Sequence, residues 1–384
     1  MDCAVPKTAA AAESGRVVVQ RDVVTAGYQQ TDFATMEKKK NEYMELDGSI
    51  ASLTTVTDVC YHWDTATSDY QMNAIEKDDL PKINEERLRN GLSAEDCRII
   101  YENLRRPYYS ELFNRDFFEK TVLSGAFDKK DCRILTYDSA MGHILQVNCP
   151  HAEFRIRIRK ERFGDMDVII IGARKPWLKE CSTDEDDSRF QYRNYVPNAF
   201  IKYMTSEDPS SFVENVAKNE LYFTYTKLSV GEIEVLVRNS IDGTCSSDNS
   251  NSERVRSWMT CLFDPSDNRT HRSVRSAFLG NIPYLMLSGF RSEDFADCME
   301  RGESTDIHPV LWNVKEKSND DIFHDAMLTG MRIFIEKIVE IFGNHPDCTE
   351  IYCSKKSDPY RSCPIKFDIF SDECVDVDLV SHSS

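Results

Sequence analysis

The segment 271–291, HRSVRSAFLGNIPYLMLSGFR, constrains the fold more than any other part of this sequence. Its first half places three apolar residues at helical spacing: Val274, Phe278 and Leu279. Gly280 and Asn281 follow, and both residue types often end a helix because they accept left-handed backbone angles. The tetrapeptide 284–287 lies between a proline and a glycine and is typical of a strand buried on both faces. The segment therefore predicts a helix, a tight turn and a buried strand within an α/β core.

The composition allows one large folded domain. Of the 384 residues, 41% are hydrophobic, which is enough for a substantial core and excludes wholesale disorder. Residues 1–15 are small and polar and are predicted to form a disordered arm, and residues 376–384 a flexible tail. Length alone would also suit two domains. We predict a single domain over residues 16–375.

Charge and cysteine content restrict the partners and the compartment. A net charge of −18 argues against broad nucleic-acid binding, which needs Lys and Arg to displace counterions, so no DNA partner is expected. A local basic groove remains compatible with this charge. The 13 cysteines include no CxxC pair, which favours free thiols in a reducing compartment. Because no apolar leader or membrane-length apolar run is present, we expect an intracellular protein of the nucleus or cytoplasm, neither secreted nor membrane-bound.

Apolar periodicity predicts a mixture of strands and helices. Strands are expected at 132–137, 142–147, 154–160, 167–172, 221–226, 234–238, 254–263, 351–353 and 365–370, and helices from Ser93, at 192–204 and at 321–342. The first two strands are predicted to pair as a hairpin, and 243–252 to form a flexible loop. The strand at 154–160 alternates strictly and places three arginines on one face: Arg155, Arg157 and Arg159. This face could line an RNA groove, or pair with acidic neighbours.

The segment 271–291 also resembles a known family. It is similar to the run x-Ser-Phe-Leu-x-Gly-Ile-Pro, apolar strand, Gly-Phe-Arg of the DXO family of RNA-decapping exoribonucleases, and the resemblance extends from about residue 90 to the end. It implies an α/β (α+β) fold in which twisted mixed β-sheets flanked by helices form a nuclease-like core. It also implies a Mg²⁺-dependent site, since two-metal cleavage of a phosphodiester needs several converging carboxylates.

Two positions of the family's active-site pattern keep their residue type here. Arg115 matches the family's Arg by its spacing from Cys132, and Asp242 matches the Asp of a Glu-x-Asp strand. Each also has a simpler interpretation. Arg115 lies among aromatic residues and could form an ordinary ion pair. Asp242 precedes Gly243, as many turn residues do.

Five positions of the pattern have lost their chemistry. Ile201 stands where the family's Gly-Tyr-x-Phe-Glu helix has its Glu, and Ser240 where the Glu-x-Asp strand has its Glu. Ser257 and Met259 take the places of Glu and Lys in a Glu-x-Lys strand, and Ser276 takes the place of a Gln. A competing register would use Glu232 and Glu234 as the carboxylate pair, but strand registers seldom slip where one face is buried.

The resemblance with these substitutions predicts a degenerate site. Asp242 would be the only metal ligand, which is insufficient for Mg²⁺, so no cofactor is expected. We expect a protein of RNA 5′-end processing and mRNA quality control that lacks catalysis and binds RNA 5′ ends or a protein partner in RNA turnover. The alternatives are an active Mg²⁺-dependent decapping enzyme or 5′→3′ exonuclease, and a protein-interaction module that does not bind RNA.

Overall fold

The computed structural model describes most of the chain from residue 51 onward. The described residues are 51–64, 66–67, 69–104, 114–126, 133–147, 154–173, 195–218, 220–230, 233–246, 252–258, 268–303, 306–314, 325–355 and 365–371. The predicted arm at 1–15 and tail at 376–384 lie outside these residues. No helix among the described residues is long and apolar enough to span a membrane.

A nine-stranded mixed sheet runs through the molecule in the order β13-β12-β4-β5-β3-β7-β6-β1-β2. Its strands are β1 (Ala51–Asp64), β2 (Asp69–Ile75), β3 (Ile134–Tyr137), β4 (Phe154–Phe163), β5 (Met166–Ala173), β6 (Leu221–Val230), β7 (Ile233–Ile241), β12 (Cys348–Lys355) and β13 (Lys366–Ser371). β3 is parallel to both of its neighbours, whereas the other pairs are antiparallel. Parallel strands require long connections, and the connection from β3 to β5 contains a helix and the strand β4.

A second sheet of four strands has the order β11-β10-β9-β8. Its strands are β8 (Gly243–Ser246), β9 (Ser252–Trp258), β10 (Tyr284–Leu287) and β11 (Val310–Asn313). One residue, Asp242, separates the end of β7 from the start of β8, so the chain passes directly from the large sheet into the small one. The Asp242 N–H donates to the Val255 carbonyl of β9 at 2.9 Å, which holds this junction against the small sheet.

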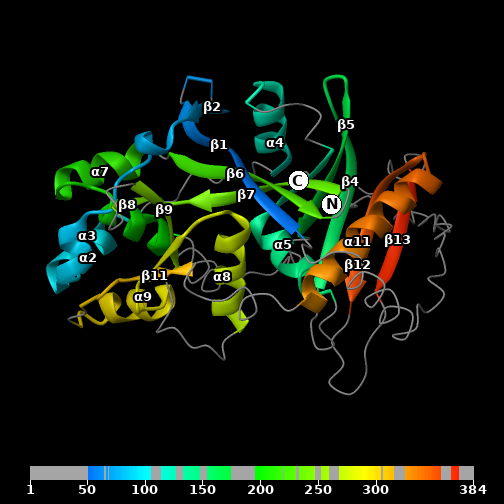
Figure 1. Ribbon diagram of the computed structural model, residues 1–384. Coiled ribbons are helices and arrows are strands. Elements are labelled where there is room, and N and C mark those ends of the chain that lie inside the picture. The colour runs from blue at the N-terminus through cyan, green and yellow to red at the C-terminus, as the bar shows by residue number, and fades with distance from the viewer. Residues whose placement is uncertain are drawn as a thin grey trace, which may run out of the picture.

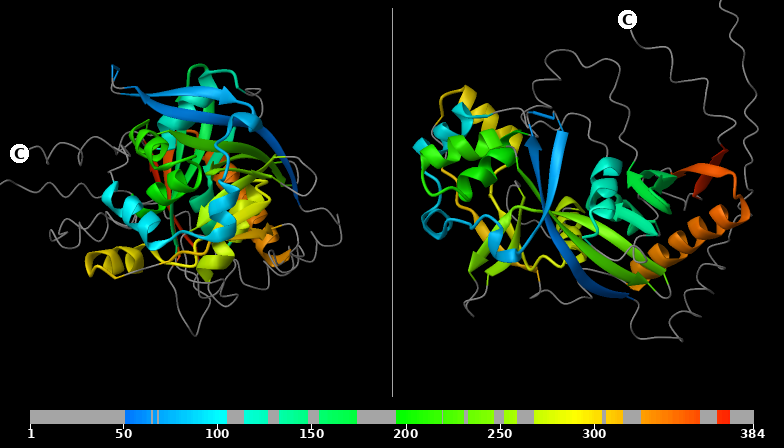
Figure 2. Two further views of the ribbon diagram at one scale, coloured as in Figure 1. Left: turned by 90° about the vertical axis from the view of Figure 1, so that its left-hand side faces the viewer. Right: turned by 90° about the horizontal axis from the view of Figure 1, so that it is seen from above.

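Helices cover both sheets. They are α2 (Glu85–Asn90), α3 (Ala94–Glu102), α4 (Asn114–Leu123), α5 (Asp138–Ile144), α7 (Pro209–Lys218), α8 (Asn268–Leu279), α9 (Ser292–Glu300), α11 (Asp325–Asn344) and an unlabelled helix at 195–204. In Figure 1, α11 lies along β12 and β13 at one end, whereas α2, α3, α7 and α9 gather around the small sheet at the other. The right-hand view of Figure 2 shows the blue strands β1 and β2 crossing the middle of the molecule between these two groups.

The predicted α/β fold is confirmed, and so is the unit at 271–291. α8 ends at Leu279, Asn281 has a φ of 51°, and the buried strand β10 follows. Gly280 packs so closely on Asn239 of β7 that a Cβ there would lie 2.9 Å from that side chain. A glycine at this position therefore lets the end of α8 approach the large sheet.

Two predictions of local structure were wrong. Residues 142–147 do not pair with β3 in a hairpin, because residues 138–144 form α5 and β3 pairs in parallel with β5 and β7. The predicted loop at 243–252 begins instead with β8, which pairs with β9. The long strand β1 was not predicted, although it pairs with both β2 and β6.

Two buried ion pairs connect one face of β9 to the large sheet and to α5. Arg254 of β9 donates from Nη2 to Asp58 of β1 at 2.6 Å and from Nε at 3.0 Å. Two residues further along the same face, Arg256 contacts Asp138 at the start of α5 at 2.6 Å. All four side chains are largely buried, so each guanidinium needs its carboxylate.

Candidate functional site

A pocket of about 280 Å³ opens where β7 passes into β8. Its lining combines polar and apolar side chains from both sides of the junction: Pro81, Asn198, Ile201, Lys202, Thr205, Asn215, Glu220, Leu221, Tyr222, Phe223, Ser240, Ile241 and Asp242. Three positions of the DXO pattern are among them, namely Ile201, Ser240 and Asp242. The structure thus brings residues that lie 41 positions apart in the sequence into one concave site.

Asp242 is held by the strand beside it. Its Oδ2 accepts the backbone N–H of Ser257 at 2.6 Å and the hydroxyl of Ser257 at 2.9 Å. Burial raises the pKa of Asp242 above its ordinary value, and the Ser257 bonds and the nearby Arg256 guanidinium offset this only in part. The carboxyl group therefore already has partners within the protein, and its charged form is disfavoured.

Arg256 links the remaining described position to this group. Its Nη1 donates to the hydroxyl of Ser276 on α8 at 2.7 Å, while its Nη2 contacts Asp138 at 2.6 Å. Five of the seven positions of the family pattern are therefore connected in space. Ile201, Ser240 and Asp242 line the pocket, and Ser257 bonds to Asp242. Ser276 bonds to Arg256, which lies near Asp242. Met259 and the side chain of Arg115 lie outside the described residues.

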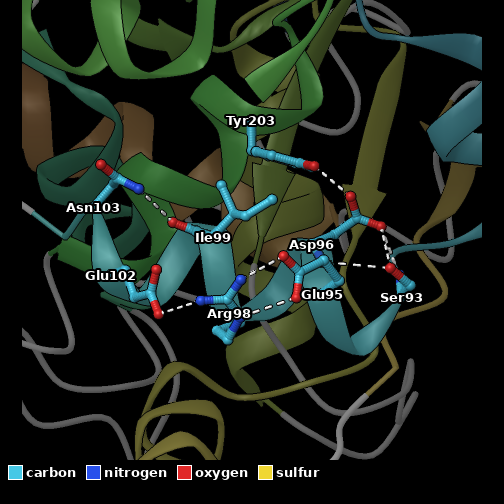
Figure 3. A network of polar contacts seen from close by, with 8 residues as sticks. All are labelled: Ser93, Glu95, Asp96, Arg98, Ile99, Glu102, Asn103 and Tyr203. Carbon is cyan, nitrogen blue, oxygen red and sulfur yellow. Dashed lines mark hydrogen bonds and ion pairs between the residues drawn. The ribbon is translucent and has the colours of Figure 1, made fainter. Parts of the chain in front are cut away.

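The helix at 195–204 presents Ile201 to the pocket, and Tyr203, two residues further along, anchors this helix to α3. The hydroxyl of Tyr203 donates to Asp96 of α3, whose other oxygen accepts from Ser93 in a capping box (Figure 3). Arg87 of α2 donates to the Tyr203 carbonyl and lies 4.0 Å from the centre of its ring. These contacts hold the helix that brings the apolar side chain of Ile201 to the pocket wall.

The predicted basic face of β4 is engaged in ion pairs. Arg157 makes two hydrogen bonds to Glu350 of β12, at 2.5 and 2.8 Å, and lies over the ring of Tyr352. Arg159 pairs with Glu161 at 3.2 Å, and the side chain of Arg155 lies outside the described residues. Carboxylates thus pair with both arginines of this face whose side chains are described, and β4 contributes no residue to the pocket lining.

The competing carboxylate register does not reach the pocket. Glu234 lies near the start of β7, is exposed, and pairs with Lys227 at 3.3 Å. Glu232 lies outside the described residues. Asp242, which directly follows the opposite end of β7, lines the pocket.

Sequence reasoning missed several polar residues of the pocket. Lys202 follows Ile201 directly, and Glu220 and Tyr222 come from the start of β6, where the Tyr222 hydroxyl donates to Glu220 at 2.6 Å. No local motif identifies Glu220 or Tyr222. The sequence offered only the position of Lys202 beside a residue of the family pattern.

Among the described residues, the pocket offers few of the ligands that a pair of divalent metal ions would need. Within the described part of the chain, no group of three or more His, Cys, Asp or Glu residues is placed to hold a metal ion. Ile201 and Ser240 line the pocket without a carboxylate, and one Asp242 oxygen is already taken by two donors. Mg²⁺ gives up its water reluctantly and is bound by proteins mainly through carboxylates, so a two-ion site needs several of them converging on one point.

The fold is one that solved structures of Rai1 and Dxo1 share. No protein-family model and no curated protein matches the sequence. Solved structures share the fold at low sequence identity. A mutant S. pombe Rai1 in complex with 3′-FADP has a TM-score of 0.56 and 13% identity, covering 85% of this chain and 98% of its own. Candida albicans Rai1 in complex with pU5 and Mn²⁺ has a TM-score of 0.54 and 12% identity, covering 84% of this chain and 91% of its own. K. lactis Dxo1 in complex with manganese has a TM-score of 0.50 and 8% identity, covering 83% of this chain and 89% of its own.

Proposed function

We propose that this protein acts in RNA 5′-end processing and quality control by binding RNA 5′ ends without hydrolysing them. The single observation that carries the proposal is the chemistry of the pocket at the β7–β8 junction. The pocket keeps the concave shape of a ligand site, yet presents Ile201 and Ser240 at two of the positions that would hold metal ions. A protein can keep its affinity for a ligand after losing catalysis when the lost groups stabilise only the transition state.

The state of Asp242 supports the absence of catalysis. A carboxyl group that is buried, raised in pKa and bonded through one oxygen to Ser257 is a poor ligand for a hard cation. Losing one preorganised charge costs on the order of 10²–10³ in rate, and groups that act as a unit fail together. With three carboxylate positions replaced, we expect no hydrolysis above background.

RNA is the ligand class suggested by the structural neighbours. Candida albicans Rai1 was solved with pU5, a short RNA with a 5′ phosphate, and it shares the fold of this chain. We infer that a nucleic acid end reaches the corresponding pocket here, and that the partner is RNA rather than DNA. Because Arg157 and Arg159 are already ion-paired, we expect their substitution by Ala to change RNA affinity little.

The test measures turnover and binding on the same RNA molecules. Purified full-length protein is incubated with labelled RNA bearing a cap, a 5′ triphosphate, a 5′ monophosphate or a 5′ hydroxyl, with Mg²⁺ or Mn²⁺, and a DNA of the same sequence serves as competitor. We expect retention of RNA without shortening. Turnover that is lost in Asp242→Ala would instead establish an active metal-dependent nuclease. If neither turnover nor binding is found, the interaction with a protein partner would be the surviving proposal.

A further inference from the structure

Glu220 is an acidic residue of the pocket wall to which the DXO pattern gives no role. It directly precedes β6 and lines the pocket together with Tyr222 and Phe223 of that strand. The residue is partly buried, so its carboxylate lies at the boundary between the protein and the pocket. A few polar groups placed in the wall of a concave site give such a site its specificity, and Glu220 is one of them here.

A hydrogen bond from Tyr222 fixes the orientation of this carboxylate. The Tyr222 hydroxyl donates to Oε2 of Glu220 at 2.6 Å, and within the described part of the chain this is the one hydrogen bond that the carboxylate accepts. Burial and the neighbouring Glu220 raise the pKa of Tyr222, so its hydroxyl keeps the proton and remains a donor. Because the two oxygens of a carboxylate together accept about four donors, the bond from Tyr222 leaves Glu220 able to accept from a ligand.

The ionisable groups of the pocket wall offer no surplus of positive charge to a phosphate group. The wall contains one ammonium group, on Lys202, and two carboxyl groups, on Glu220 and Asp242. The Lys202 ammonium already donates to the Asn215 carbonyl at 2.7 Å. A phosphate inside the pocket would lie close to carboxyl oxygens, whereas a neutral group with N–H donors would find acceptors there. We therefore expect the phosphates of an RNA 5′ end to stay outside and a neutral part of the end to enter.

The size and the walls of the pocket suit a single base. Ligand pockets commonly have volumes of about 300–1,000 Å³, and this pocket, at about 280 Å³, lies at the small end of that range. Tyr222 and Phe223 contribute aromatic rings to its lining, and Ile201 contributes an apolar side chain. The unstacked bases of single-stranded RNA are commonly bound on aromatic side chains, while their edges form hydrogen bonds with polar groups. Glu220 is a polar group of this kind beside the two rings.

We propose that Glu220 is the specificity-determining residue of this pocket and selects a guanine base at the 5′ end of RNA. Guanine is the RNA base whose Watson–Crick edge carries two adjacent N–H donors, at N1 and at the N2 amino group, and a carboxylate accepts both. The proposal rests on the proposed function, because it assumes that an RNA 5′ end reaches the pocket. A guanine in the first nucleotide and a guanine in a 5′–5′ linked cap present the same edge. The simpler alternative is that Glu220 only bonds to Tyr222 and has no effect on base preference.

The experiment compares RNA ends that differ in one base. Four 3′-fluorescein-labelled RNA decamers are used: three with a 5′ hydroxyl that begin with guanosine, inosine or adenosine, and the adenosine decamer with a GpppA cap. Binding to the full-length protein is followed by fluorescence anisotropy in EDTA. Glu220→Gln keeps the shape of the side chain and replaces the carboxylate by an amide, and Tyr222→Phe removes the hydroxyl that orients it. Glu234→Gln is the matched control, because it makes the same change at an exposed position of β7 outside the pocket lining. Thermal unfolding checks that each variant folds.

The expected result is that the wild type binds the guanosine RNA about 10-fold more tightly than the adenosine RNA, as for one bidentate contact to a base. Inosine, which lacks the N2 amino group, should lie between them. Glu220→Gln should reverse the preference, because an amide pairs with adenine through one donor and one acceptor. Tyr222→Phe should reduce the preference without reversing it, and Glu234→Gln should retain it. If the pocket takes its guanine from a cap, the GpppA RNA alone should bind about 10-fold more tightly, and Glu220→Gln should remove that gain.

Other outcomes separate the two proposals. If the wild type binds none of these RNAs, the proposed function is overturned together with this inference. Equal binding of all four RNAs by the wild type, or a base preference that Glu220→Gln and Glu234→Gln change equally, would overturn the role of Glu220 alone. If Glu220→Gln does not fold, competition on the wild type decides the question. Guanosine must then displace the RNA more effectively than inosine, and inosine more effectively than adenosine, whereas equal displacement refutes the inference.

Discussion

The buried ion pair between Arg254 and Asp58 allows the sharpest test of how the two sheets are held together. We consider Arg254→Met, which preserves much of the side-chain volume but removes the guanidinium. The Asp58 side chain is 3% exposed and receives three contacts from Arg254, at 2.6, 3.0 and 3.2 Å. Without Arg254, a carboxylate would remain buried and have lost its guanidinium partner, which costs about 3–5 kcal/mol.

The expected shift in urea unfolding follows from this free energy. With a denaturant dependence of about 3 kcal/mol/M, a loss of 3–5 kcal/mol lowers the midpoint by about 1–1.7 M. The double variant Asp58→Asn/Arg254→Met should recover a large part of the loss, because it removes the buried charge as well. The surface pair of Arg301 and Glu303, which is more than half exposed at both side chains, provides the control. Arg301→Met should cost no more than about 1 kcal/mol.

Two results would refute this reasoning. If Arg254→Met and Arg301→Met shifted the midpoint equally, the contact between the sheets would not depend on the ion pair. If the double variant were as unstable as the sum of Arg254→Met and Asp58→Asn, the two groups would not be coupled, and the distances between them would carry no energetic meaning.

Three further predictions concern the pocket and its support. Restoring carboxylates in an Ile201→Glu/Ser240→Glu/Ser257→Glu variant should produce a Mn²⁺-dependent rise in melting temperature that the wild type lacks, and the lack of any rise would refute our account of the lost metal site. Because burial raises the pKa of Asp242 above 3.8, the protonated form is favoured on folding. The wild type should therefore lose stability relative to Asp242→Asn as the pH rises from about 4 toward neutrality, measured by urea unfolding at several pH values, and an opposite slope would contradict the raised pKa. Tyr203→Phe removes the hydroxyl that bonds to α3 and should lower the free energy of unfolding by about 1–2 kcal/mol, whereas an unchanged midpoint would show that this contact does not anchor the helix.

Local sequence signals predicted the part of the fold in which neighbouring residues determine the conformation. Gly280, Asn281 and the buried run at 284–287 predicted the end of α8 and the strand β10 correctly. The hairpin predicted after β3 failed because the run that follows is apolar enough to be buried in either conformation. Parallel pairing of β3 with both of its neighbours excludes a hairpin there, and that pairing involves residues 35 and 101 positions away in the sequence.

The candidate site divides in the same way between local and long-range information. Family spacing identified Ile201, Ser240 and Asp242, which the structure brings to one pocket. Arg256 had no motif, and its role depends on contacts to α5 and α8 that only the folded chain creates. Lys202 likewise gains its environment from α7, whose position relative to the helix at 195–204 no local pattern specifies.

The contacts of Asp242 within the fold give this residue a structural role that does not depend on a metal ion. It is the one residue between β7 and β8, its N–H bonds to Val255, and its carboxyl accepts two bonds from Ser257. These contacts hold the edge of β9 at the point where the chain changes sheets. An asparagine could accept the same bonds, whereas an alanine could not. Asp242→Asn should therefore keep both the fold and the binding of RNA, while Asp242→Ala should weaken the junction. If Asp242→Asn abolished RNA binding in EDTA while the protein remained folded, the charge of Asp242 would act directly on the ligand, and its role would exceed that of a structural acceptor.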